Sequence, residues 1–104
     1  MKIKLTKPTA WDEVTYTELD IDLERLTGAD SLAVTRKLRK EYPKEPVLQP
    51  ETDDRYVLAM AARAARVPEE LFGALPLPEF ARVKMEVQAF LLGAAGEVPE
   101  ETES

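Results

Sequence analysis

The first part of the chain has the hydrophobic pattern of two β-strands. Residues 2–6 alternate between polar and apolar side chains, which is the period of a half-buried strand. A second alternating run covers residues 14–23, and its phase changes near Glu18, where we expect a β-bulge or a late start of the strand. Two such runs separated by a short polar segment predict an antiparallel hairpin over about residues 2–23. A lone hairpin is marginally stable in water, so apolar side chains from elsewhere must cover it.

From Thr27 onward the pattern becomes helical. Thr27 and Asp30 have the spacing of a capping box, which predicts a helix over about residues 28–42. Residues 43–51 contain three prolines and predict an extended connector. The apolar positions expected on this first helix are Leu32, Ala33, Leu38 and Tyr42. Three further helices are expected, over about residues 53–67 with Thr52 as N-cap, 69–75 and 78–93.

The final helix has the clearest apolar periodicity in the chain. Residues 96–104, which follow it, are acidic and poor in apolar side chains, so we expect a disordered tail there. The whole pattern predicts an α+β fold in a single domain over residues 1–95, with an N-terminal β-hairpin followed by three to four α-helices that form a small helical domain. The residues that predict the core-facing stripe of the final helix are Phe80, Val83, Val87, Phe90, Leu91 and Ala94.

The composition excludes several classes of chemistry. The 104 residues include neither cysteine nor histidine, which excludes disulfides, thiolate zinc sites and catalysis by imidazole. A net charge of −6, from 14 Lys and Arg against 20 Asp and Glu, argues against attraction of the whole chain to nucleic acid or anionic lipid. No stretch approaches the ~20 apolar residues of a membrane span. We therefore expect a cytoplasmic protein with no membrane association, metal or cofactor.

The densest group of carboxylates lies in the predicted hairpin. The carboxylates that alternate along its second strand share one face, which could hold a hard cation such as Ca²⁺ or Mg²⁺. Calcium loops also need a tight turn with glycine among the ligands, and this segment has none, so we expect a solvated outer face. A carboxylate pair for acid–base catalysis needs an enclosing pocket, for which so small a core leaves little room, so we expect no enzyme. The group consists of Asp12, Glu13, Glu18, Asp20, Asp22 and Glu24.

A basic run lies on the first predicted helix and consists of Arg36, Lys37, Arg39 and Lys40. It could contact phosphates, dock an acidic protein segment, or form a solvated face that suits the helix dipole near the C-terminal end. A helix-turn-helix is disfavoured, because nine residues with three prolines separate this helix from the next. A small nucleic-acid-associated or regulatory domain that uses residues 36–40 is therefore the alternative and not the favoured function.

Met85 and Leu92 fall off the core-facing stripe of the final helix. In a chain this small, exposed apolar residues beside a packed stripe indicate contact with another chain. Packing against the hairpin within the same domain explains them equally well, and the sequence leaves both interpretations open. Trp11, the only tryptophan, lies next to the predicted turn and is expected to cap the open end of the core.

Five short segments occur in a recognisable order along the chain. They are Ile3-Lys4-Leu5-Thr6-Lys7-Pro8, Leu19-Asp20-Ile21, Leu26-Thr27-Gly28-Ala29-Asp30, Glu79-Phe80 and Phe90-Leu91. Together they resemble the small tail assembly chaperones encoded by long-tailed and contractile-tailed bacteriophages and their prophages. The resemblance covers about residues 3–93 and rests on capping and core motifs. The chain departs from the family pattern in its long proline connector and in its longer, acidic strand turn.

The resemblance implies a non-enzymatic assembly factor. Such chaperones bind the long, helix-rich tape measure protein, keep it soluble and recruit tail tube subunits, and they are absent from the finished virion. Their genes often have a frameshifted longer product that shares the N-terminal domain. The expected partners are therefore the tape measure protein, the tail tube protein, a longer form and further copies of the chain, in the host bacterial cytoplasm. The residues expected to contact the partner are Met85 and Leu92, with Arg36, Lys37, Arg39 and Lys40 steering its acidic segments.

Overall fold

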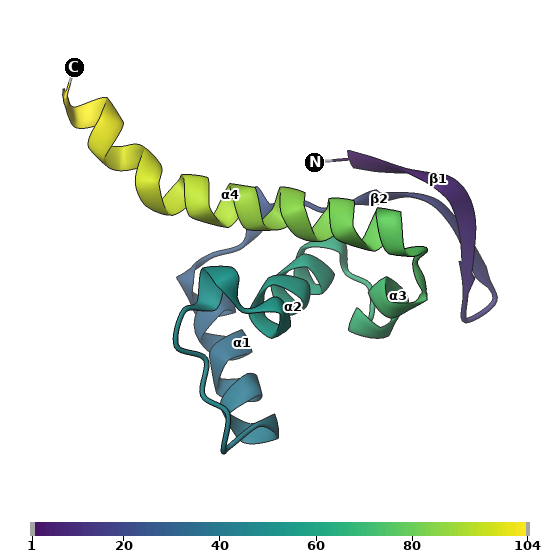
Figure 1. Ribbon diagram of the computed structural model, residues 1–104, viewed down its shortest axis with the longest axis horizontal. Coiled ribbons are helices and arrows are strands. Elements are labelled where there is room, and N and C mark those ends of the chain that lie inside the picture. Colours follow the sequence, from purple (N-terminus) through teal and green to yellow (C-terminus); the bar gives the residue numbers. More distant parts are fainter. Residues whose placement is uncertain (1, 104) are drawn as a thin grey trace.

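The computed structural model describes residues 2–93, together with the course of the last helix to its end. An antiparallel hairpin of β1 (Lys2–Trp11) and β2 (Val14–Asp20) precedes four α-helices, as Figure 1 shows. The expected α+β class is therefore confirmed. The last helix continues past its expected end at residue 93. The expected tail at 96–104 falls outside the fully described residues and stays a prediction. The helices are α1 (Gly28–Glu41), α2 (Asp54–Ala65), α3 (Glu69–Ala74) and α4 (Leu77–Glu103), with short 3-10 turns η1 (Leu23–Arg25) and η2 (Pro50–Thr52).

The hairpin closes at a two-residue turn, Asp12 and Glu13, whose φ angles of 51° and 66° are both left-handed. Positive φ at both central residues is the signature of the type I′ turn, whose twist matches that of the strands. The expectation of a bulge near Glu18 is wrong about the strand that contains the extra residues. The register is irregular opposite Glu18, but the extra residues belong to β1, between Lys4 and Thr9. That segment contains Pro8, which has no N–H to donate to a partner strand.

The core forms where the hairpin, α2, α3 and α4 meet. The strand residues that alternate inward are buried, so the period-2 pattern of the sequence correctly identifies the covered face of the hairpin. Trp11 is partly buried against this cluster, in agreement with its expected capping position. Small alanine side chains on α2 let its neighbours approach closely. The buried side chains include Ile3, Leu5, Leu19 and Ile21 of the hairpin segment, Val57 and Ala61 of α2, Leu71 and Phe72 of α3, and Val83 and Val87 of α4.

A second, smaller cluster holds α1 against α2. Val34 and Leu38 are buried there against Tyr56, Ala59 and Met60. The expectation that Leu32 and Tyr42 share this buried face is wrong. Leu32 is 60% exposed and Tyr42 is 38% exposed, because α1 packs on α2 through a narrow face whose buried apolar side chains are Val34 and Leu38.

The helix starts follow their capping residues. The Thr27 N–H donates to the Asp30 carboxylate over 2.8 Å, so the expected capping box of α1 is confirmed. The expected N-cap of α2 is wrong by one residue. Asp53 occupies that position and accepts the Arg55 N–H over 2.9 Å, whereas Thr52 belongs to η2. An aspartate carboxylate is at least as good an N-cap as a threonine hydroxyl.

Candidate partner-binding surfaces

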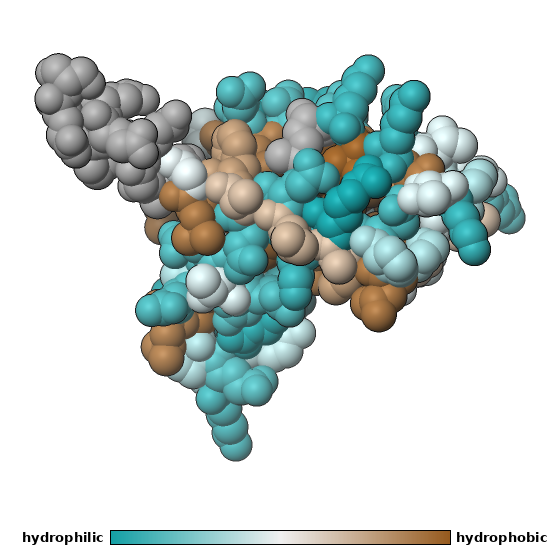
Figure 2. Space-filling view, turned by 45° about the horizontal axis from the view of Figure 1, so that its top comes forward, coloured by the Kyte–Doolittle hydropathy of each residue, from teal (hydrophilic) through white to brown (hydrophobic). Residues whose placement is uncertain are grey.

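The side of α4 that faces away from the core has a second line of apolar side chains. Leu77, Met85 and Leu92 are 75%, 65% and 48% exposed, and Ala81 between them is half-buried. Spacings of four, four and seven residues place these positions on one side of a helix with 3.6 residues per turn. We call them the outer stripe. Figure 2 shows apolar residues running obliquely across this face between hydrophilic ones.

The exposure of Met85 and Leu92 argues against one of their two interpretations, packing against the hairpin. Both side chains are exposed and belong to neither hydrophobic cluster, so they do not pack against the hairpin. Sequence reasoning missed Leu77, because it placed the start of the final helix one residue later, at residue 78. Its distance of eight residues from Met85 was the signal that could have placed it on the same side of the helix.

The charged flank of α4 fixes the helix on β1. The Thr6 N–H and hydroxyl donate to the two oxygens of the buried Glu79 carboxylate over 2.6 and 2.9 Å. One turn later, Arg82 donates to the carbonyl of Lys4. The Thr6 N–H and then its hydroxyl hold the pKa of Glu79 below its usual value by stabilising the carboxylate. These bonds set the rotation of α4 that turns the outer stripe away from the core.

The basic run on α1 is exposed along its whole length. All four side chains are exposed. Arg36, Arg39 and Lys40 lie on the solvent side of the helix, away from the buried Val34 and Leu38, and Lys37 lies at the edge of that side. Lys37 donates to Glu69 of α3 over 3.1 Å, which raises the pKa of Lys37. The other three cations form no ion pair with any residue that the structure describes. They are therefore free to attract an acidic partner.

The basic run and the outer stripe do not form one continuous site. In Figure 1, α4 passes over one side of α2 and α1 packs against another. The candidate residues chosen from the sequence thus fall on two separate surfaces.

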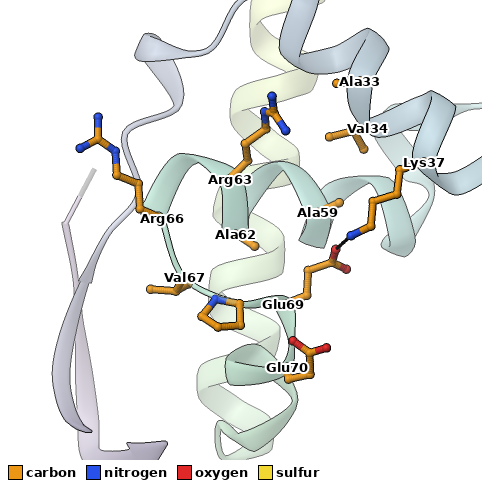
Figure 3. A pocket seen from close by; sticks show the side chains of 11 residues that line it. Ala33, Val34, Lys37, Ala59, Ala62, Arg63, Arg66, Val67, Glu69 and Glu70 are labelled. Carbon is orange, nitrogen blue, oxygen red and sulfur yellow. Dashed lines mark hydrogen bonds and ion pairs between the residues drawn. The ribbon is translucent and has the colours of Figure 1, made fainter. Parts of the chain in front are cut away.

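A cleft at the junction of α1, α2 and α3 is a third feature, which sequence reasoning missed. It has a volume of about 400 Å³ and is lined by residues from all three helices and from the segment that joins α2 to α3. Figure 3 shows the pair of Lys37 and Glu69 along one side of it. No local sequence motif marks the cleft, because its walls come from segments far apart in the chain.

A comparison with models of known protein families identifies the family of this chain. The family model described as phage tail assembly chaperone proteins, E, or 41 or 14, matches residues 2–92. The chain belongs to this phage tail assembly chaperone family. Neither the curated proteins nor the solved structures contain a significant match to it. The match includes the proline connector and the acidic hairpin, the two places where the chain departs from the expected family pattern.

The acidic hairpin of this chaperone shows no sign of a metal site. Within the described part of the chain, no group of three or more carboxylates is arranged to hold a metal ion. Glu18, Asp22 and Glu24 are exposed instead, as expected for a solvated face. Among the described residues, no helix is both long and apolar enough to cross a membrane.

Proposed function

We propose that this tail assembly chaperone binds the phage tape measure protein and assists assembly of the tail tube. The outer stripe of α4 is the observation that carries the proposal. A long helical protein such as a tape measure exposes apolar helix faces before assembly, and a complementary apolar helix face can cover them by helix-in-groove contact.

The exposure of the stripe supports this role. Leu77 and Met85 are large apolar side chains that lie mostly in water, on a helix whose opposite side already contributes Val83 and Val87 to the core. Burying such side chains against a partner is favourable by about 1.5–3 kcal/mol for each one that becomes fully covered. The stripe therefore fits an interface with another protein better than it fits a catalytic or metal-binding role.

The remaining parts of the proposal follow from the family. A chaperone acts by binding and not by chemistry, so we assign no catalytic residue. The tail tube protein, a frameshifted longer form and further copies of the chain are the additional partners that we propose. We place the protein in the host bacterial cytoplasm during assembly and not in the mature virion.

Coexpression with the tape measure protein of the same phage tests the proposal. The chaperone should raise the soluble yield of the tape measure protein, and the two should copurify. Met85→Glu combined with Leu92→Glu should reduce the copurified amount at least about tenfold, because it places two charges in the centre of an apolar interface.

A matched control separates the stripe from general surface hydrophobicity. Val14→Glu combined with Leu48→Glu also replaces two exposed apolar residues and changes the net charge equally, but on the hairpin and the connector. This control should copurify as the wild type does. The proposal fails if the purified protein never retains the tape measure protein at any salt concentration. Binding of nucleic acid at physiological salt would favour the alternative function of residues 36–40 instead.

A further inference from the structure

We propose that the cleft between α1, α2 and α3 is a second docking site, which accepts an apolar side chain from an acidic peptide segment of a partner protein. This inference goes beyond the proposed function of the outer stripe, because α2 separates the two surfaces. It rests on the shape of the cleft, the chemistry of its floor and the charge of its surroundings.

The floor of the cleft is apolar and built from small side chains. Val34 of α1 and Ala59 and Ala62 of α2 are buried at this floor. Val67 and Pro68, in the segment that leads into α3, also line the cleft. Small side chains leave the open volume of about 400 Å³, which lies within the range of about 300–1,000 Å³ typical of ligand clefts. The accessible lining of the cleft is otherwise mostly polar, so this small apolar floor suits a single apolar side chain and not a large apolar ligand.

The rim of the cleft carries charges of both signs. Lys37 pairs with Glu69, and Arg63 pairs with Asp30 over 2.6 Å. Arg66 also lines the cleft, is exposed, and forms no ion pair with a described residue. In Figure 3, Ala59 and Ala62 lie between the Lys37–Glu69 pair and the two arginines.

The surroundings of the cleft are positive in a chain that is negative overall. Lys37, Arg63 and Arg66 line the cleft, against the two carboxylates of Glu69 and Glu70. Arg36, Arg39 and Lys40 continue along α1 from Lys37, beyond the rim of the cleft. The whole chain nevertheless has a net charge of −6. Complementary potentials steer association and suppress wrong partners. The charge distribution therefore favours an acidic segment here and disfavours a second copy of this acidic chain.

The same rim disfavours a phosphate-based ligand. Glu69 and Glu70 both line the cleft, so a phosphate held inside it would lie beside two carboxylates, whereas a peptide can keep its own carboxylates outside the cleft. A peptide can instead place its apolar side chain on the floor and direct its carboxylates toward Arg66 and the free cations of α1. This combination of floor and rim points to an acidic peptide with one apolar anchor.

Peptide titration followed by the amide signals of the full-length chain tests the proposal. The probe is a short, blocked peptide of Glu and Asp with one central Leu, and the comparison peptide has Ser in place of Leu. The Leu peptide should shift the amides of Lys37, Arg63, Val67 and Glu69 and leave the α4 amides between Met85 and Leu92 unchanged. The Ser peptide should bind at least about tenfold more weakly, because it lacks the anchor.

Two variants probe the floor and the rim separately. Ala33→Leu places a larger apolar side chain at a half-buried position of the lining and should weaken the Leu peptide about tenfold by filling the cleft. Arg66→Asn removes a cation but keeps a residue type that tolerates the left-handed backbone at this position, where φ is 60°. It should weaken binding about threefold to fivefold. Lys7→Gln removes an exposed cation from β1 and serves as the matched control.

Each outcome bears on the proposal. Localised shifts that require the Leu and respond to both cleft variants support it, and thermal melting of each variant verifies that the fold survives. Equal shifts from inorganic phosphate or from the Ser peptide would overturn the apolar anchor, and Arg66→Asn binding as tightly as Lys7→Gln would overturn the basic rim. The experiment contains no tape measure protein, so its failure is distinct from a failure of the outer stripe to bind that partner.

Discussion

At the scale of single residues, Glu79 determines how α4 meets the hairpin. Its carboxylate is buried, accepts two hydrogen bonds from Thr6, and lies 3.7 Å from the Arg82 guanidinium. Apolar contacts alone would allow the helix to rotate or slide, whereas these directional bonds fix one arrangement. The orientation of the outer stripe thus depends on a residue that does not belong to it.

Glu79→Gln should lower the melting temperature by several degrees at neutral pH. The amide keeps the size of the side chain but replaces a charged acceptor with a neutral one and points a donor group at Thr6. The effect should depend on pH in a defined direction. Since the fold lowers the pKa of Glu79, its contribution is full above the pKa of the unfolded chain and is lost as the pH falls through the folded value.

Thermal melts of the wild type and Glu79→Gln between pH 7 and pH 3 measure this contribution. The gap between the two melting temperatures should close toward low pH. Asp30 and Asp53 also have lowered pKa values, because they accept hydrogen bonds from Arg63 and Arg55, so the wild type should lose further stability in the same direction. Glu24→Gln, an exposed carboxylate with no such bonds, is the control. A difference in melting temperature between the wild type and Glu79→Gln that stays constant with pH would contradict the stabilising role of the Glu79 carboxylate.

At the scale of elements, patterns within one element were predictable and contacts between elements were not. The capping box of α1 and the buried positions Val83 and Val87 follow from residues close together in sequence. The burial of Leu32 was predicted wrongly, because its exposure depends on which face of α1 meets α2. The location of the extra residues in β1 depends likewise on how the strand bends past Pro8.

The centre and the edge of the core should respond differently to the same substitution. Phe72 of α3 is 1% exposed at the centre of the core, so Phe72→Ala should cost about 3–5 kcal/mol of unfolding free energy. Phe90 of α4 is half-buried at its edge, so Phe90→Ala should cost clearly less. Urea unfolding measures both, and the slope with denaturant verifies that the two variants unfold from similar states. Equal losses would show that α4 near Phe90 is as central to the core as α3.

At the scale of the whole molecule, the sequence singles out candidate surface residues but does not reveal how they are arranged in space. Met85, Leu92 and the basic run all lie at the surface, although the sequence left the exposure of Met85 and Leu92 open. The sequence did not reveal that they occupy separate surfaces, because that depends on how α1 and α4 pack around α2. The cleft was missed for the same reason, since three helices build it.

This separation predicts different kinetic effects for the two surfaces in binding to the tape measure protein. Arg36→Gln, Arg39→Gln and Lys40→Gln together should slow association about tenfold at low salt and change dissociation little, because exposed charges act mainly on encounter. Lys37 is left intact because it pairs with Glu69. Raising the salt concentration to about 1 M should remove the difference in association rate between this triple variant and the wild type, since the electrostatic screening length falls to about 3 Å. The pair Met85→Glu and Leu92→Glu should instead speed dissociation.

Surface plasmon resonance with immobilised tape measure protein resolves the two rates. Lys2→Gln, Lys7→Gln and Lys44→Gln together remove the same number of exposed cations from β1 and the connector. This control matches the net charge of the α1 variant, so it separates local steering from a general change in charge. If the control slows association as much as the α1 variant does, the steering comes from overall charge and not from α1. If the α1 variant instead speeds dissociation and leaves association unchanged, its cations lie within the interface and hold the complex together.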